Sequence, residues 1–199
     1  MKARTTILAF VGHHEDAAWV QNQRVPLVRV APHVCLGAAS DSSLDDSSVQ
    51  DGSGALNHAA GLYALVDGHL VGLEEGQVAT DSSCAGKSAA DHAARCILQR
   101  LLRDRCAGLA ALLPHLHGLF AVVLYDRDSD ILWCARDPLG TRPLYYTLDE
   151  RGVFAASTIA ALQQLSGRHY PIDSQRAVDF LTHGFNWHED PHDTFFKDI

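Results

Sequence analysis

Two pairs of β-rich runs in the second half of the chain constrain its fold most strongly. Phe120 to Tyr125 and Ile131 to Ala135 are separated by five polar residues, and Leu144 to Leu148 and Val153 to Ala156 are separated by a second polar turn. Runs of this kind, bounded by turn residues, predict antiparallel hairpins. Because a hairpin must bury at least one of its faces, the rest of the chain has to supply covering layers.

Two other segments have the pattern of helices that could cover these strands. Ser88 to Asp91 has the form of a capping box, while Asp173 is a candidate N-cap and Gly184 a candidate helix end. Apolar residues follow both caps at helical spacing: Ala90, Ala94, Ile97, Leu98, Leu101 and Leu102 after the first, and Ala177, Phe180 and Leu181 after the second. With 199 residues, 47% of them apolar, the chain can build one sizeable core. We therefore predict an α+β fold, a layered sandwich, in which residues 1–199 form a single domain.

The first half of the chain offers shorter strand signals. Thr6 to Val11 is an apolar run that predicts a buried strand. Gly61 to Val66 is a second such run, followed by Asp67 and Gly68 and then by another apolar pair. An Asp-Gly pair between apolar runs is typical of a tight turn, so a hairpin centred on Asp67 and Gly68 is predicted.

Composition excludes several classes of partner. The 24 acidic and 16 basic residues give a formal net charge of -8, which opposes binding to nucleic acid or to an anionic membrane. No apolar stretch approaches the roughly 20 residues that span a bilayer, and the first residues lack a signal-peptide pattern, so a cytoplasmic location is predicted. The cysteines are odd in number and include no CxxC pair, which predicts neither a disulfide framework nor a zinc ribbon. They are Cys35, Cys84, Cys96, Cys106 and Cys134.

A set of motifs with consistent order and spacing resembles one family. The dense part runs from Leu116 to Leu162 and contains Leu-His-Gly-Leu-Phe-Ala-Val-Val-Leu-Tyr-Asp, Arg-Asp-Pro-Leu-Gly-Thr-Arg-Pro-Leu-Tyr-Tyr and Phe-Ala-Ala-Ser; a thinner part continues to Ile199. These segments resemble the type 2 glutamine amidotransferase domain of the asparagine synthetase family, which includes β-lactam synthetases and lasso-peptide cyclases. The resemblance implies the four-layer αββα sandwich of the N-terminal-nucleophile hydrolases.

The resemblance also implies a partner. In the relatives, an ATP-dependent synthetase domain with a Ser-Gly-Gly-x-Asp-Ser loop follows this segment, and the present sequence contains no such loop. We therefore expect ATP and Mg to be bound only by a synthetase domain or a separate synthetase chain, and no cofactor to be bound by this chain. A homodimer is also left open.

The motif from Arg136 to Pro143 is conspicuous enough to suggest catalysis. An Arg and an Asp beside Pro138 and Gly140 can equally well brace a loop by charge-assisted hydrogen bonds and set how two hairpins meet. We interpret Arg136, Asp137, Pro138, Gly140 and Pro143 as a structural motif.

The residues that carry glutamine hydrolysis in the family are replaced in this chain. Thr5 stands where the resemblance places the N-terminal cysteine, and the peptide bond to Arg4 leaves it without a free α-amine to act as base. Asp67 and Gly68 replace the Asn-Gly pair that supports the oxyanion. Gly68 keeps its N-H, but a carboxylate about 4 Å from an oxyanion repels it by about 4 kcal/mol at an effective dielectric near 20.

Substrate recognition is also altered. The segment from Val34 to Asp41 lacks the arginine that binds the substrate carboxylate in the family. Asp91 matches the aspartate that receives the substrate's α-amino group, although a capping role beside Ser88 is the preferred interpretation.

Histidines near the C-terminus suggest a metal site that their spacing does not favour. Pro191 interrupts any regular helix that would present His188 and His192 together. The cluster consists of His183, His188 and His192 with Glu189, Asp190 and Asp193. We interpret it as an exit loop and predict no metal.

We therefore predict a glutaminase-like domain with no catalytic residues, which serves as a scaffold for the synthetase part of an amide ligase. Thr5, Asp67, Gly68 and Asp91 would be residual positions of the glutamine site. One alternative is an amide hydrolase made active by cleavage that exposes Thr5 as an N-terminal nucleophile. Another is a stand-alone protein-binding module that uses the polar loop from Ala39 to Gly54 or its acidic surface. Whether the chain is an enzyme is left undecided.

Overall fold

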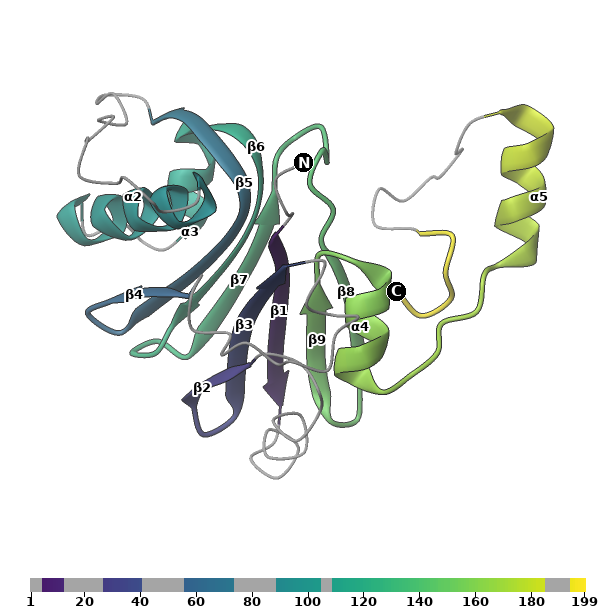
Figure 1. The fold of residues 1–199 in the computed structure, drawn as a ribbon, viewed down its shortest axis with the longest axis horizontal. Helices are drawn as coiled ribbons and strands as arrows, with labels where there is room; N and C mark the ends of the chain where they lie inside the picture. The colour runs from purple at the N-terminus through teal and green to yellow at the C-terminus, as the bar shows by residue number, and fades with distance from the viewer. Residues whose placement is uncertain (1–4, 13–26, 41–55, 74–88, 105–108, 185–193) are drawn as a thin grey trace.

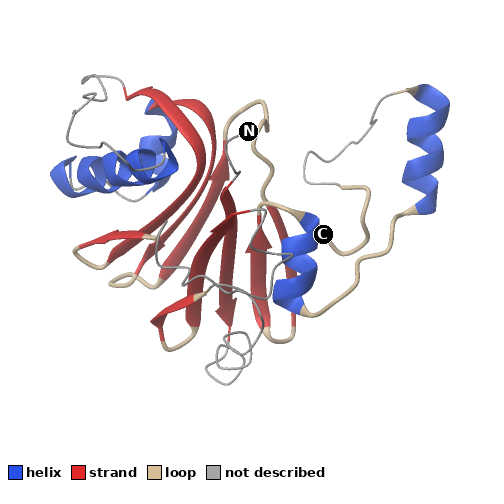
Figure 2. Cartoon of the chain, in the orientation of Figure 1, coloured by secondary structure: helices blue, strands red, loops and turns tan. Residues whose placement is uncertain are grey.

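The computed structural model describes residues 5–12, 27–40, 56–73, 89–104, 109–184 and 194–199. They form two antiparallel sheets that face each other, with helices on the outer sides (Figures 1 and 2). The five-stranded sheet has the order β2-β3-β1-β9-β8, with β1 Thr5–Gly12, β2 Val28–Ala31, β3 Val34–Ser40, β8 Tyr145–Asp149 and β9 Gly152–Ala156. The four-stranded sheet has the order β4-β5-β6-β7, with β4 Asn57–Ala59, β5 Leu62–Leu73, β6 Leu116–Asp126 and β7 Ile131–Arg136. The helices are α2 Ala89–Asp104, α3 Leu109–Leu112, the 3-10 helix η4 Leu113–His115, α4 Ile159–Ser166 and α5 Ser174–His183.

Alternation along the central strands distributes apolar side chains over separate layers. In β1, Ile7 and Ala9 pack between the sheets, whereas Leu8 and Phe10 pack with α4 on the outer face of the five-stranded sheet. Because successive side chains of a strand point to opposite faces, a run that is apolar at every position fills two cores at once.

Strand β6 likewise supplies apolar side chains to both faces of the four-stranded sheet. Val122 and Leu124 pack against α2, while Val123 and Tyr125 face the other sheet. The layers are therefore α4, the five-stranded sheet, the four-stranded sheet and α2, which confirms the predicted α+β fold and its αββα order.

The two hairpins predicted in the second half are confirmed as β6–β7 and β8–β9. The hairpin predicted at Asp67 and Gly68 is wrong. Strand β5 runs through both residues and pairs with β6 on either side of them. The tight turn lies earlier, at Ala60 and Gly61, whose φ angles of 48° and 83° join β4 to β5.

Gly68 is required by a close approach of two backbones. Its φ is 116°, and a Cβ at this position would lie 2.0 Å from the carbonyl oxygen of Leu119. The Asp-Gly pair therefore marks a place where β5 and β6 come together, which local sequence alone does not distinguish from a turn.

Helix α5 forms as predicted but covers no sheet face. Asp173 caps it by accepting hydrogen bonds from the amides of Gln175 at 2.9 Å and Arg176 at 3.3 Å, and Gly184 ends it with a φ of 76°. None of its residues is buried, and Leu181 is 80% exposed.

The unpredicted helix α4 covers the five-stranded sheet instead. Thr158 caps this helix by accepting from the amide of Ala161 at 3.2 Å, and the helix's own Leu162 and Leu165 are fully buried against the sheet. No helix within the described ranges is long and apolar enough to cross a membrane.

Asp137 ties the loop between β7 and β8 to strand β6. Its buried carboxylate accepts hydrogen bonds from the amides of Phe120, Leu139, Thr141 and Arg142, at 3.1–3.3 Å, and from the Thr141 hydroxyl at 2.7 Å. Its own amide donates to the carbonyl of Phe120 at 2.9 Å. These contacts hold the loop between β7 and β8 against strand β6.

The same loop folds over Arg136. Gly140 has a φ of 62°, and a Cβ there would lie 3.5 Å from the Arg136 guanidinium. Burial would raise the pKa of the Asp137 carboxyl, but the hydrogen bonds from Thr141, Arg142 and Phe120 outweigh burial, so this pKa lies below its ordinary value.

We predict that Asp137→Asn lowers the free energy of unfolding at pH 7 by about 2–4 kcal/mol, because the amide loses the charge and turns a donor toward other donors. A lowered folded-state pKa stabilises the fold above the unfolded value near 4, and this contribution is lost as the pH falls further. The difference between wild type and variant should therefore shrink below about pH 4. Denaturant unfolding at pH 7 and pH 3 measures both effects. Asp128→Asn, at an exposed position, is the control, and an equal effect of the two variants would contradict the bracing role.

A second prediction concerns Gly68. Gly68→Ala should destabilise the chain by more than about 2 kcal/mol, because it adds a backbone clash to a positive φ. Gly184→Ala is the matched control: its φ is 76°, but nothing lies within 4 Å of the added Cβ. It should cost only about 1 kcal/mol. Thermal and denaturant unfolding compare the two, and equal losses would show that β5 and β6 do not approach so closely.

Candidate functional site

Two of the positions that the family resemblance assigns to the glutamine site, Thr5 and Asp67, lie on strands that face each other. Thr5 starts β1, and its Cα pairs with Ser40 of β3. Further along β1, Ile7 shares the buried cluster between the sheets with Leu65 of β5, the strand that also carries Asp67. The topology thus brings the first strand and the Asp67 strand to opposite sides of the same interior (Figure 1).

Asp67 is a buried carboxylate that faces this interior. Ala64 and Val66 pack under α2, while Leu65 packs between the sheets. By alternation, Asp67 shares the inward face with Leu65, and it is 2% exposed. A buried carboxylate is costly unless it is paired.

Arg142 pairs with Asp67. The Nη1 atom of Arg142 lies 3.6 Å from Oδ1 of Asp67. The Arg142 amide is in turn held by Asp137, so the braced loop delivers the guanidinium to the carboxylate. At an effective dielectric near 20, this separation corresponds to an attraction of about 4–5 kcal/mol, which desolvation partly offsets.

Sequence reasoning did not single out Arg142. Asp67 and Arg142 are far apart in the chain, and no local pattern links them. The only signal is that Arg142 lies inside the 136–143 motif, five of whose residues are interpreted as structural.

Among the described strands, none accepts a hydrogen bond from the main-chain N-H of Gly68. Its partner in β6 is Phe120. The Phe120 amide donates to the Asp137 carboxylate, and the Phe120 carbonyl accepts from the Asp137 amide, so both groups face away from β5. The alternation of an antiparallel ladder then turns the Gly68 N-H and C=O away from β6. Strand β4 pairs only with residues 62–64 of β5 and stops short of Gly68. One N-H of the kind that stabilises an oxyanion is thus present, next to a carboxylate.

Asp91 is engaged elsewhere. Its Oδ1 accepts from the Asn57 amide nitrogen of β4 at 3.2 Å, and Arg95 donates to the Asn57 amide oxygen at 3.2 Å. Helix α2 lies on the outer face of the four-stranded sheet, whereas Asp67 points to the inner face. The structure therefore does not bring Asp91 and Asp67 to one side of the sheet. The predicted capping partner Ser88 lies outside the described residues.

The segment that corresponds to the family's carboxylate-binding strand, and that lacks its arginine, forms a buried strand here. Val34 and Leu36 of β3 are fully buried between the sheets. Burial raises the pKa of the Cys35 thiol to about 11, although the positive charge of Arg29 acts to lower this pKa. The Cys35 thiol is therefore protonated at neutral pH, and a protonated thiol is a poor nucleophile.

The described part of the histidine cluster is His183 alone. Its Nδ1 lies 2.9 Å from the carbonyl oxygen of Asp179 at the end of α5. His188, Glu189, Asp190, His192 and Asp193 lie outside the described residues. Within the described ranges, no group of three metal-ligating side chains is placed to hold an ion.

Comparison with known proteins identifies relatives of this chain. It is 31% identical over 70 residues to the glutamine-hydrolysing asparagine synthetase 1 of Bacillus subtilis (strain 168), covering 35% of this chain and 11% of that protein. It is 38% identical over 48 residues to asparagine synthetase 3 of the same organism, covering 24% and 8%. It is 31% identical over 129 residues to the amidase chry2 of Gibberella zeae, covering 64% and 18%. The chain thus matches only a small part of the length of these relatives.

Among solved structures, glutamine phosphoribosylpyrophosphate amidotransferase from Bacillus subtilis, complexed with ADP and GMP, aligns with 81% of this chain and 43% of its own, at a TM-score of 0.45 and 14% identity. Residues 98–199, about half of the chain, match the glutamine amidotransferase domain family. The chain belongs to the glutamine amidotransferase domain family and is related to the corresponding region of asparagine synthetases.

Proposed function

We propose that this domain no longer hydrolyses glutamine and acts as a scaffold for the synthetase part of an ATP-dependent amide ligase. The observation that carries the proposal is the ion pair between the buried Asp67 and the partly exposed Arg142, beside Gly68. The resemblance places an amide donor where Asp67 stands, and Arg142 favours the ionised form of the carboxyl group. An ionised carboxylate accepts hydrogen bonds and cannot donate one to an oxyanion.

The first strand supports the same conclusion. Thr5 stands at the position of the catalytic cysteine and is joined to Arg4 by a peptide bond. A hydroxyl without an adjacent base is a weak nucleophile, and loss of the nucleophile lowers hydrolase turnover by about a millionfold. Two elements of the reaction, attack and oxyanion stabilisation, are thus weakened independently.

The synthetase part of the proposal rests on the relatives. Two of them are named asparagine synthetases, and each is much longer than the stretch that it shares with this chain. ATP and Mg would be bound by that other part. A ligase that takes its amine from its own substrate needs no ammonia, which would explain how the glutamine site could be lost. As part of this proposal, we place the assembly in the cytoplasm.

A second candidate is an amide hydrolase activated by processing. The unused N-H of Gly68 favours it, since one oxyanion donor is retained, and one relative is named an amidase. Cleavage after Arg4 would give Thr5 a free amine to act as its own base.

We expect no ammonia release from glutamine by the full chain or by a chain produced with Thr5 as its first residue. In the trimmed chain, the Thr5→Cys variant should still turn over about 100-fold more slowly than the double variant that combines Thr5→Cys with Asp67→Asn, because the carboxylate removes one donor and repels the oxyanion. Ammonia release is measured by a coupled assay, with intact mass confirming the N-terminus. Turnover by the trimmed wild type would favour the processed hydrolase. Equal rates of the single and double variants would show that Asp67 does not weaken oxyanion stabilisation.

The scaffold role has its own test. Purification from the native source should yield this domain joined to, or in complex with, a polypeptide that contains a Ser-Gly-Gly-x-Asp-Ser loop and binds ATP. Mass spectrometry identifies that polypeptide by sequence. Recovery of the domain alone would contradict the scaffold role and favour the stand-alone module, whose proposed loop lies mostly outside the described residues.

A further inference from the structure

Helix α2 carries a histidine and a cysteine whose side chains meet on its surface. His92 and Cys96 are four residues apart, so they share one face of the helix. The Sγ atom of Cys96 lies 3.6 Å from Nε2 of His92. Both residues are partly exposed. They therefore form a pair of metal-ligating groups at the surface of the molecule.

The backbone that carries this pair is fixed against the four-stranded sheet. Ala93 and Ile97, on the adjacent face of α2, are buried in the cluster between the helix and the sheet. In the first turn, Asp91 accepts a hydrogen bond from the Asn57 side chain of β4, and Arg95 donates to the same side chain. The two ligands are thus already together before a metal ion arrives, which reduces the entropy lost on binding.

The distance between the two ligand atoms matches a tetrahedral zinc ion. A Zn–S bond of about 2.3 Å and a Zn–N bond of about 2.0–2.1 Å, meeting at about 109°, place sulfur and nitrogen about 3.5–3.6 Å apart. An angle of about 90°, as in octahedral or square-planar ions, would place them only about 3.1 Å apart. The separation of 3.6 Å therefore suits a tetrahedral ion without any change.

The chemistry of the pair favours the same ion. Zinc prefers thiolate sulfur and imidazole nitrogen, whereas magnesium and calcium prefer oxygen ligands. In the metal-free chain, one proton lies in the hydrogen bond between Cys96 Sγ and His92 Nε2. A zinc ion would take the place of that proton, which passes to solvent, and would bind the thiolate and the neutral imidazole.

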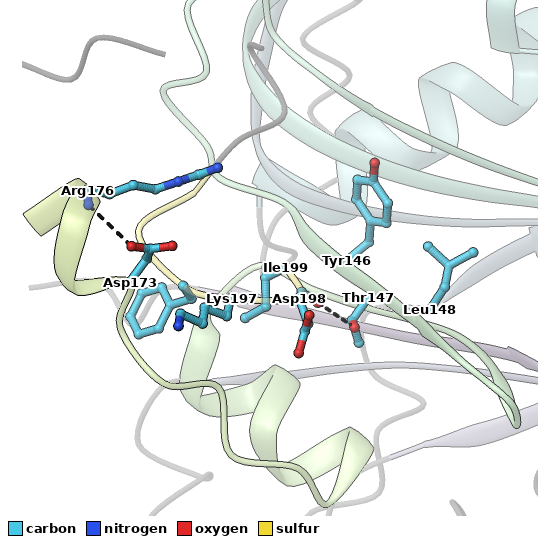
Figure 3. A pocket seen from close by; sticks show the side chains of 9 residues that line it. Tyr146, Thr147, Leu148, Asp173, Arg176, Lys197, Asp198 and Ile199 are labelled. Carbon is cyan, nitrogen blue, oxygen red and sulfur yellow. Dashed lines mark hydrogen bonds between the residues drawn. The ribbon is translucent and has the colours of Figure 1, made fainter. Parts of the chain in front are cut away.

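The acidic residues of the cavity beside β8 offer no comparable pair. This cavity of about 580 Å³ is lined by Asp173 and Asp198, among others (Figure 3). The Asp173 carboxylate caps α5 by accepting from the amides of Gln175 and Arg176, and the Asp198 carboxylate lies 3.7 Å from Arg168. A cation bound there would have to compete with these contacts.

We infer that His92 and Cys96 form an exchangeable, two-ligand site for Zn²⁺ on the outer layer of the molecule, with water at the other positions of the tetrahedron. Within the described ranges, no third metal-ligating side chain is placed to complete a group of three. Structural zinc sites use four protein ligands and catalytic sites three, so two ligands bind more weakly and leave positions open. The inference goes beyond the proposed function and does not depend on it. No metal was expected from the sequence, where the C-terminal histidines were the candidates.

Titration of the reduced full chain with Co²⁺ tests the site, because a thiolate bound to tetrahedral Co²⁺ gives a charge-transfer band in the near ultraviolet. This band should appear in the wild type and disappear when Zn²⁺ is added. Cys96→Ser and His92→Ala should each weaken binding by more than about 100-fold, since loss of a group that merely supports a ligand already costs about 10–100-fold. Absence of the band in the wild type, or its survival in either variant, would overturn the inference.

Two further variants test the spacing of the ligands. Cys96→His keeps two ligands four residues apart, so it should still bind Zn²⁺ in calorimetric titration while the Co²⁺ charge-transfer band is lost. The double variant that combines His92→Ala with Leu102→His keeps the number of histidines but places the new one on a different face of α2, and it should not bind. Leu102 is 42% exposed, so the fold should tolerate the change. Binding by the double variant would contradict the site.

Other cysteines provide the matched controls. Cys134→Ser removes an exposed thiol of β7 and should leave the band unchanged. Cys84→Ser and Cys106→Ser, at positions outside the described residues, should do the same, and loss of the band in any of the three would overturn the two-ligand assignment. Unfolding midpoints without metal check that each variant folds. A shift of the His92 ring signals in NMR when Zn²⁺ is added to the wild type is expected in addition, and its absence would also overturn the inference.

Discussion

Each sheet of this molecule is covered on both faces, and this constraint determines most of what its strands look like. A strand that packs against a helix on one side and a sheet on the other must be apolar at consecutive positions, as Ile7 to Phe10 and Phe120 to Tyr125 are. In such a strand, a charged residue is an exception that needs a partner. Asp67 is that exception, and Arg142 is its partner.

The second half of the fold could be predicted from the sequence because its turns are local. The polar residues between β6 and β7, and between β8 and β9, define both hairpins, and Asp173 and Gly184 define the ends of α5. The hairpin predicted at Asp67 and Gly68 failed because pairing with β6 overrode a local turn signal. Helix α4 was not predicted because eight residues give too little periodicity to separate a short helix from a loop.

The candidate site was only partly predictable. Family resemblance gave Thr5, Asp67 and Gly68 as positions, and the sandwich does place the strands that carry them face to face. It could not give Arg142, because the pairing with Asp67 depends on how a loop after β7 lies against β5. Nor could sequence show that Asp91 is engaged with Asn57 on the far face of the sheet. Contacts between distant segments have no local signature.

Asp137 connects the fold of the loop between β7 and β8 to the ion pair of Asp67. Its carboxylate holds the amide of Arg142, and Arg142 compensates Asp67. Asp137 thereby helps to place the positive charge that faces Asp67. An amide at position 67 would leave the Arg142 guanidinium without this carboxylate, so the residue types at positions 67 and 142 are coupled.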